Sequence, residues 1–383
     1  MWLKWFPWRF IVRKVARHQG FLDPLVVFSK LQNFAQPSDV LFPTELLRSG
    51  VVLHARGLMN SLAIQHNLDW IWPYWVERQF NPRDDAFVPR AFSITQINLT
   101  HRNWTAVGLP DCPAYPLVDP RGLVTPLYDG WSIDAWIVTG KNSAFIPSRL
   151  PEASQKLILD GNLAVETGLA QGPFQIDSRV EVVGTKENPF CQIHFKGKSS
   201  SSAWLVVSLR PYNPEGVSFI DHIELLDGDR GWRVNKKDFV CFSEIPERHV
   251  FSYYRRGDVY PRLFEDDKDR ATYCKVGMAS AAALFKLDPN AAREIVVQVP
   301  LLPAKEPPPG VQSFPSNPSW SEALEGQCRL EIPDKQFQFL YDAALKTLIL
   351  HCPLEVYPGP DQSRLAAQSR RRARGNPWGI SQP

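Results

Sequence analysis

Apolar and polar residues alternate along most of the middle of the chain, with the period of two expected of strands that bury one face. The first such run is Phe92–Thr100. Further runs of strand length lie at residues 131–139, 156–167, 178–185, 190–196, 203–209, 217–225, 238–242, 276–287 and 294–299. Turn-forming residues, such as Asp227-Gly228-Asp229, separate many of these runs, and no helices of crossover spacing lie between them. The pattern therefore predicts a mainly β fold, a large antiparallel β-sandwich.

Helical spacing of apolar residues is found towards the two ends of the chain. Residues 8–65 and 334–351 show it, and residues 300–333 between the strands and the second helix are rich in proline. Residues 361–383 contain five arginines, one acidic residue and no apolar period. We therefore predict an N-terminal helical segment packed on the sandwich (1–65), the sandwich (66–299), a Pro-rich linker (300–333), a first helix and turn of a further helical domain (334–360) and a disordered basic tail (361–383).

Composition narrows the classes of function. The 43 basic and 40 acidic residues give a net charge of +3, so there is no general attraction to nucleic acid. The cysteines at 112, 191, 241, 274, 328 and 352 form no Cys-x-x-Cys pair, and the histidines form no metal-binding motif. We expect reduced thiols in a cytoplasmic protein, with no metal and no cofactor.

The first 18 residues combine three tryptophans and five Lys or Arg residues with no acid. Their apolar run is too short and too interrupted to span a bilayer. The favoured interpretation is an amphipathic helix packed on its own domain, and contact with a membrane surface through residues 1–18 stays an open alternative.

Tryptophans interleaved with polar residues form the candidate binding site. Six of the 13 tryptophans lie between residues 70 and 136, among Asn, Asp, His and Arg residues. Flat aromatic faces beside hydrogen-bonding groups are typical of sugar binding. The candidate residues are Trp70, Trp72, Trp75, Asn103, Trp104, Trp131, Asp134 and Trp136. The alternative is that the tryptophans fill the core of the sandwich.

Paired carboxylates would be needed for glycoside hydrolysis. Asp129 with Asp134, or Glu215 with Asp221, could be nominated, but acids exposed in turns are the commoner explanation of such residues. Gly-x-Ser-x-Gly and phosphate-loop motifs are absent from the sequence.

Ser208–Ile220 contains the sequence Arg-Pro-Tyr-Asn-Pro-Glu-Gly and resembles a segment of the six-hairpin, glucoamylase-like and glycogen-debranching-like superfamily. The helix at 334–351, followed by the turn Tyr357–Pro360, resembles the entry into the (α/α)6 barrel of those proteins. The resemblance implies a sandwich that precedes a barrel, with the catalytic carboxylates in the barrel. Because residues from Asp361 onward lack the expected Trp-Phe-Arg-Asp-like motif, no catalytic residue is carried over, and Arg210, Asn213 and Glu215 are expected to be structural.

The sequence thus predicts the truncated, non-catalytic sandwich portion of a glycoside-hydrolase-like protein of the α-glucan class, inactive alone. Its expected partner is an oligo- or polysaccharide, with no nucleic acid, and self-association through exposed apolar surface stays open. Two alternatives remain: a complete interaction or scaffold module, and an active glycosidase that uses acids within the sandwich.

Overall fold

A computed structural model describes much of the chain. The described residues are 60–79 (except 61 and 65), 104–127, 130–140, 143–214, 216–266, 268–304, 306–314, 319–325 and 329–352. All of them belong to one compact unit, residues 55–383. The predicted strand at 92–100, most of the predicted helical segment 1–65 and the basic tail 361–383 lie outside the described residues.

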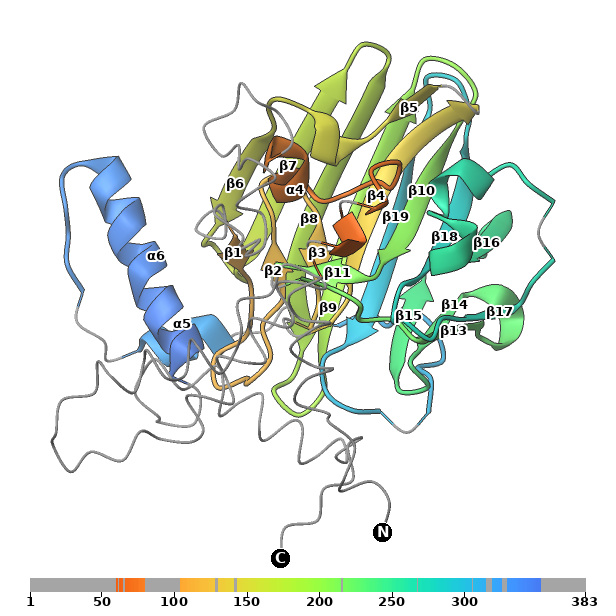
Figure 1. The fold of residues 1–383 in the computed structure, drawn as a ribbon. Helices are drawn as coiled ribbons and strands as arrows, with labels where there is room; N and C mark the ends of the chain where they lie inside the picture. The colour runs from red at the N-terminus through yellow and green to blue at the C-terminus, as the bar shows by residue number, and fades with distance from the viewer. Residues whose placement is uncertain are drawn as a thin grey trace, which may run out of the picture. The chain divides into compact units, whose positions relative to one another are not determined.

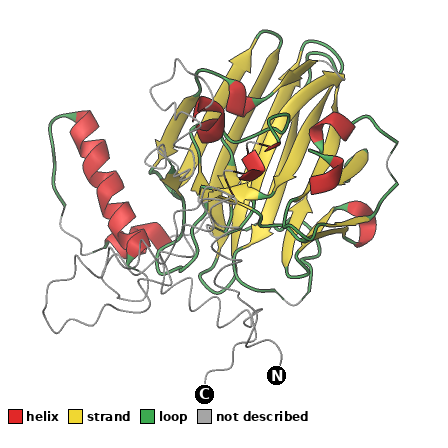
Figure 2. Cartoon of the chain, in the orientation of Figure 1, coloured by secondary structure: helices red, strands yellow, loops and turns green. Residues whose placement is uncertain are grey.

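Two large antiparallel sheets dominate the described part of the chain (Figures 1 and 2). Sheet A has the order β1 (Thr105–Ala106), β2 (Leu117–Val118), β3 (Val124–Thr125), β4 (Ser132–Gly140), β10 (Ala203–Arg210), β18 (Ala279–Leu287) and β16 (Arg248–Tyr253), with β5 (Ser143–Phe145) paired to β4. Sheet B has the order β17 (Ala271–Tyr273), β13 (His222–Leu225), β14 (Gly231–Val234), β15 (Asp238–Phe242), β19 (Ala292–Pro300), β9 (Pro189–Ser199), β8 (Phe174–Gly184), β7 (Ala164–Gln171) and β6 (Ser154–Ile158). β11 (Tyr212–Asn213) and β12 (Gly216–Val217) form a small separate ribbon.

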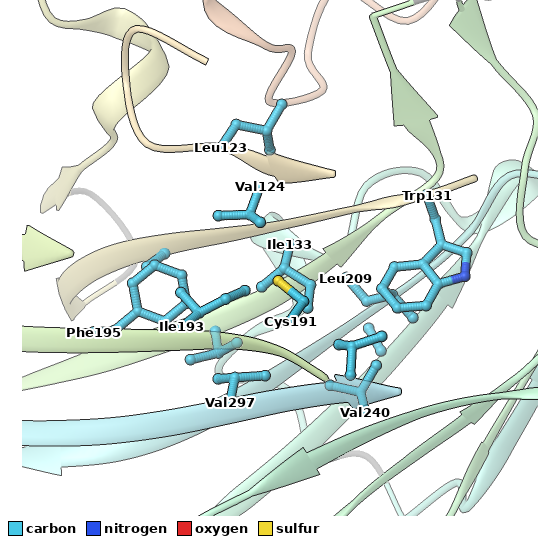
Figure 3. Close-up of a cluster of buried hydrophobic side chains, with 14 of the residues drawn as sticks. Leu123, Val124, Trp131, Ile133, Cys191, Ile193, Phe195, Leu209, Val240 and Val297 are labelled. Atoms are coloured by element: carbon cyan, nitrogen blue, oxygen red, sulfur yellow. The ribbon is translucent and has the colours of Figure 1, made fainter. Parts of the chain in front are cut away.

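The main core lies between the two sheets, where their inward-facing side chains meet (Figure 3). Ile133 and Leu209 come from sheet A, and Ile193 and Val297 come from sheet B. Each of these four side chains is fully buried. Alternation along the strands produces this core, because β8 buries every second residue from Ile176 to Val182.

The outer faces of the two sheets differ. The outer face of sheet A carries a second buried cluster, which includes Ile71, Trp136, Val206 and Leu284. This double coverage explains why nearly all of β18 is buried and why it is rich in alanine. The outer face of sheet B along β6 to β9 instead carries charged and polar residues. A ligand therefore has access to sheet B and not to the covered part of sheet A.

A proline-rich segment, here called the strap (residues 301–314), follows β19 and packs against the outer face of sheet B. Its Ala304 and Val311 pack against a small buried cluster that contains Phe239 and Cys241. The ring of its Phe314 lies 5.2 Å from that of Phe190, centroid to centroid. The strap thus covers the outer face of sheet B beside the open polar region.

The α-helices with described bounds are α4 (Tyr74–Gln79), α5 (Ser319–Leu324) and α6 (Lys335–His351), and residues 62–64 are helical as well. Asp334 caps α6, since its Oδ1 accepts hydrogen bonds from the backbone N–H groups of Gln336 (2.8 Å) and Phe337 (3.1 Å). α6 docks through Leu350, which packs with Trp320 and Leu163. None of the helices within the described ranges is long and apolar enough to cross a bilayer.

The mainly β sandwich predicted from the alternation is confirmed, as is a helix at the position predicted for residues 334–351. Two predicted strands were wrong in detail. Residues 217–225 are not one strand but include the end of β12 and all of β13. Residues 156–167 form parts of β6 and β7, because the turn around Asp160-Gly161 reverses the chain between them. The strands β14 and β16 were missed, as were the short strands β1, β2, β3, β5, β11 and β17.

Candidate functional site

The structure buries the tryptophans that the sequence nominated. Trp70, Trp72, Trp75, Trp131 and Trp136 are each no more than 1% exposed. Trp104 is half-buried against the main core, and Asn103 lies outside the described residues. The rings of Trp70 and Trp72 stack on each other, with centroids 5.8 Å apart, and leave no open aromatic face. Burial of this kind agrees with the alternative that these residues belong to the core.

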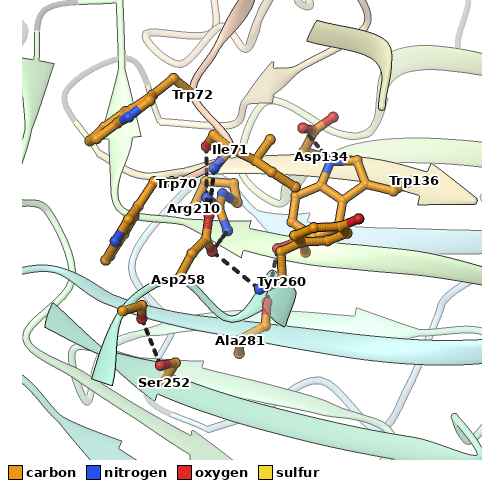
Figure 4. A network of polar contacts seen from close by, with 12 residues as sticks. Trp70, Ile71, Trp72, Asp134, Trp136, Arg210, Ser252, Asp258, Tyr260 and Ala281 are labelled. Carbon is orange, nitrogen blue, oxygen red and sulfur yellow. Dashed lines mark hydrogen bonds and ion pairs between the residues drawn. The ribbon is translucent and has the colours of Figure 1, made fainter. Parts of the chain in front are cut away.

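Trp70 and Trp136 flank a buried ion pair (Figure 4). The guanidinium of Arg210 donates two hydrogen bonds of 2.7 Å to the two carboxylate oxygens of Asp258. Its Nη2 also donates to the backbone oxygen of Ile71 (2.8 Å), and the backbone N–H of Ile71 donates to Asp258 Oδ2 (2.7 Å). Burial opposes the charge of Arg210, but the carboxylate of Asp258 raises the pKa of Arg210 above its usual value. This network holds the segment around Ile71 on sheet A.

Asp134, which the sequence suggested as a binding or catalytic carboxylate, is instead buried and hydrogen-bonded within sheet A. Its Oδ2 accepts a hydrogen bond from Trp136 Nε1 (2.7 Å) and its Oδ1 accepts one from the backbone N–H of Ala135 (2.9 Å). Burial raises the pKa of Asp134 to about 6, although these hydrogen bonds and the charge of Arg210 oppose the rise. Of the possible catalytic partners, Asp129 and Glu215 lie outside the described residues.

An open polar groove lies on the outer face of sheet B and is formed by β6, β7, β8, β9 and β19. The groove has a volume of about 400 Å³. It is lined by Ser154, Lys156, Glu166, Thr167, Gly168, Asp177, Ser178, Arg179, His194, Lys196 and Glu294.

Strand register places the groove side chains in two parallel rows. Lys156, Glu166, Arg179 and His194 stand opposite one another on β6 to β9 and form the first row. The second row, two residues further along each strand, is Ser154, Gly168, Asp177, Lys196 and Glu294. Gly168 has no side chain in the middle of its row, and this leaves room in the groove.

Ion pairs fix part of this surface. Arg179 Nη1 lies 2.7 Å from Glu166 Oε1, and Arg179 Nε lies 3.2 Å from Glu181 Oε1. His194 Nδ1 lies 2.7 Å from Glu294 Oε1. The ion pairs restrict the side-chain rotamers of Arg179, Glu166 and Glu181. The oxygen and nitrogen atoms of these groups that are not used in the pairs are therefore fixed in position and can bind a ligand.

The charges lining the groove are balanced. Lys156, Arg179 and Lys196 provide three positive charges, and Glu166, Asp177 and Glu294 provide three negative charges. Donors and acceptors therefore alternate across strands that lie about 4.8 Å apart. Such an arrangement can hydrogen-bond a neutral ligand with many hydroxyl groups, and it favours neither an anion nor a cation.

A second hollow, of about 510 Å³, lies near β13 and β16 and is lined by Asp229, Glu247, Arg248 and Arg270 among others. Two of its charged residues, Arg270 and Asp229, pair with each other, and Glu247 pairs with Arg293, which lies outside the lining. Within the described ranges, no group of three or more His, Cys, Asp or Glu residues is arranged to hold a metal ion. The five cysteines in those ranges are free thiols.

The groove was not predicted from the sequence because its residues are scattered over a long stretch of chain. A signal was present in the alternation, since Glu166, Arg179 and His194 occupy the polar positions of otherwise apolar strands. Which strands pair, and therefore which polar positions meet, cannot be read from periodicity alone.

No family model and no curated protein matches the sequence. Among solved structures, a bacterial glucoamylase complexed with acarbose is similar with a TM-score of 0.38 and 12% identity, over 52% of this chain and 33% of that chain. A putative kojibiose phosphorylase from the human microbiome is similar with a TM-score of 0.27 and 8% identity, over 70% and 31% of the two chains. A family GH92 alpha-mannosidase from Bacteroides thetaiotaomicron gives a TM-score of 0.25 and 8% identity, over 63% and 35%.

The matched regions therefore amount to about a third of each of these three larger proteins. At these TM-scores and identities, the likenesses assign neither a family nor an activity to the chain.

Proposed function

We propose that this chain is a non-catalytic β-sandwich unit of a carbohydrate-active protein and that it binds a neutral oligo- or polysaccharide in the groove on sheet B. The observation that carries the proposal is the groove itself: two rows of alternating donors and acceptors with balanced charge on an open sheet face. The resemblance of Ser208–Ile220 to the glucoamylase-like superfamily supports an α-glucan as the ligand class.

In this proposal the buried tryptophans stabilise the fold and do not contact the saccharide. They are too enclosed to stack on a sugar ring in the described structure. No tryptophan, tyrosine or phenylalanine is among the groove-lining residues, so the groove offers hydrogen bonds without the large aromatic faces on which sugars stack. We therefore expect weak, millimolar affinity for maltooligosaccharides.

A glycine substitution tests the proposal with little disturbance of the fold. A Cβ added at Gly168 would lie 3.4 Å from Asp177 Oδ1, an ordinary contact, and a longer side chain would extend into the groove. Gly168→Leu should therefore abolish saccharide binding measured by calorimetry. Gly140→Leu is the matched control, since a Cβ there meets nothing within 4 Å and Gly140 is not a groove residue.

Unchanged affinity in Gly168→Leu would place any saccharide elsewhere. Absence of binding by the unmodified protein at millimolar maltooligosaccharide would contradict the proposed function itself.

A second candidate function, as an interaction module, is favoured by α6. Its Phe337, Leu340 and Leu348 are 63%, 59% and 54% exposed. Their spacing places them along one side of the helix, while Leu350 is buried against Trp320. Exposed apolar stripes of this kind mark association surfaces.

Light scattering tests this second candidate. Self-association should decrease in the variant Phe337→Ser/Leu340→Ser and persist in Leu330→Ser, because Leu330 is 52% exposed but lies outside α6. A protein that is monomeric at high concentration before any substitution would remove this candidate.

A further inference from the structure

A chain of hydrogen bonds connects the strap with the groove. Gln298 is on β19, and its side chain faces the strap and is 1% exposed. Its Oε1 accepts a hydrogen bond from the backbone N–H of Gln312 (2.7 Å), and its Nε2 donates to the backbone oxygen of the same residue (2.7 Å). The orientation of the Gln298 amide is therefore fixed by one backbone donor and one backbone acceptor.

These two hydrogen bonds between the Gln298 amide and the Gln312 backbone, here called the clasp, determine the donor and the acceptor in each of the next hydrogen bonds towards the groove. Gln298 Nε2 also donates to Gln192 Oε1 (2.6 Å), which stands directly opposite on β9. Because the oxygen of Gln192 is occupied in this way, its Nε2 is the atom that faces His194 Nε2, at 2.9 Å. An amide nitrogen only donates, so His194 Nε2 must accept.

The remaining ring nitrogen of His194 then carries a hydrogen. His194 Nδ1 lies 2.7 Å from Glu294 Oε1, so it donates to that carboxylate. Glu294 is half-exposed at the groove, and its second oxygen stays available to a ligand hydroxyl. The strap backbone thus determines the tautomer of a groove histidine three side chains away.

We infer that Gln298 is a positioning residue that couples the strap to the groove: it fixes Gln192, selects the Nδ1–H tautomer of His194 and orients Glu294 as an acceptor for the saccharide. The part that concerns the saccharide rests on the proposed function. The coupling between strap and His194 does not, since it follows from hydrogen-bond directions alone. Movement of the strap would consequently change the hydrogen bonds offered to a ligand in the groove.

Nitrogen-15 spectra of the histidine rings test the coupling directly, because the ring shifts show which nitrogen carries the hydrogen. The signals of His194 are assigned by their loss in His194→Asn. In the unmodified protein, His194 should be a single Nδ1–H tautomer. Gln298→Met keeps the volume but removes both ends of the clasp, and should give a mixture of tautomers.

Gln312 provides matched variants in the strap. Only its backbone takes part in the clasp, so Gln312→Ala should leave the His194 spectrum unchanged. Gln312→Pro removes the N–H donor but keeps the carbonyl acceptor, so it should change the spectrum in the same direction as Gln298→Met and by less. Saccharide affinity should fall roughly three- to tenfold in Gln298→Met, the loss expected for one or two misdirected hydrogen bonds.

The inference is overturned if His194 carries its hydrogen on Nε2 in the unmodified protein, or if Gln298→Met leaves the ring spectrum unchanged. If the spectrum changes as expected but no saccharide binds to any variant, the coupling stands and the proposed function fails. The two claims are therefore separable in one set of variants.

Discussion

Arg210 and Asp258 form a two-point ion pair, with Arg210 Nη1 and Nη2 each 2.7 Å from one carboxylate oxygen of Asp258, and both side chains are completely buried. The two residues belong to β10 and to the segment after β16, and both also bond to the backbone of Ile71. A buried ion pair of this kind contributes less to the free energy of unfolding than its short distances suggest, because both charges lose their hydration. Removal of only one of the two charged side chains nevertheless lowers stability strongly, because the other charge stays buried without its partner.

Asp258→Ala should destabilise the protein by roughly 3–5 kcal/mol, because Arg210 would keep a buried charge without a partner. Arg210→Met should be similarly harmful, and the double variant Arg210→Met/Asp258→Leu should lose less than the sum of the two. Urea unfolding measures all three. The matched control is Glu224→Ala, which breaks a half-exposed pair with Arg233 across β13 and β14 and should cost less than about 1 kcal/mol. Equal losses from the buried and half-exposed pairs would contradict this account.

Asp119 gives stability an unusual dependence on pH. Its Oδ1 accepts hydrogen bonds from the backbone N–H groups of Arg121 and Leu123, but its buried Oδ2 has no partner among the described residues. Burial raises the pKa of Asp119 from 3.8 to about 7. The folded state therefore holds a proton that the unfolded state releases, and stability should decline as the pH rises from about 4 to about 7.

Asp119→Asn should reduce this decline and make the protein more stable than the unmodified one at pH 8, with a difference on the order of 1 kcal/mol or more. Part of the decline should persist, since the pKa of Asp134 is also raised, to about 6, by burial. Unfolding by urea at pH 5 and pH 8 measures both effects. An Asp119→Asn variant with the same pH dependence as the unmodified protein would show that Asp119 is ionised without cost.

His249 acts in the opposite direction at acid pH. Trp232 Nε1 donates to its Nδ1 (3.2 Å), and its Nε2 lies 3.0 Å from the backbone oxygen of Asp229. Burial lowers the pKa of His249 below 6.5, so the folded state favours the neutral ring. Acidification through pH 6.5 protonates the unfolded state first and should lower the free energy of unfolding.

In His249→Leu this acid-dependent loss should disappear. The variant should also be less stable at all pH values by about 1–3 kcal/mol, because the buried Trp232 N–H would lose its acceptor. Thermal unfolding between pH 5 and pH 8 separates the two effects. An acid dependence that survives the substitution would assign it to another group.

The architecture was more predictable than the site. Alternation in β8 and β9 depends on burial of one face, and this periodicity is visible in the residues themselves. The helix of residues 335–351 was equally clear, since Asp334 caps it and Pro353 follows its end. β16 was missed because its residues Arg248–Tyr253 mix charged, aromatic and apolar side chains without a clean period.

Sequence reasoning assigned the tryptophans and Asp134 to a candidate binding site because their types suit sugar binding. Residue type does not reveal burial, and the second cluster on sheet A covers Trp136 while the Arg210–Asp258 pair lies beside Trp70. The groove residues, by contrast, come together through the pairing of β6 to β9 and β19, which joins residues about 100 positions apart. Such long-range pairing is set by the whole sheet and not by any local segment.

The central claim is that a saccharide binds in the sheet B groove and not at the tryptophans. One titration tests both sites: a transverse-relaxation-optimised 1H–15N spectrum of the protein with added maltooligosaccharide, which reports backbone amides and indole N–H groups together. The buried indole N–H groups of Trp70 and Trp75 have no hydrogen-bond partner in the part of the chain that the structure describes, so a sugar that reached them would shift their signals strongly.

We predict that the amides of Gly168, Arg179 and His194 shift with increasing maltooligosaccharide while the indole signals of Trp70 and Trp75 stay in place. Shifts confined to those indole signals, or a spectrum that does not change at millimolar sugar, would contradict the account.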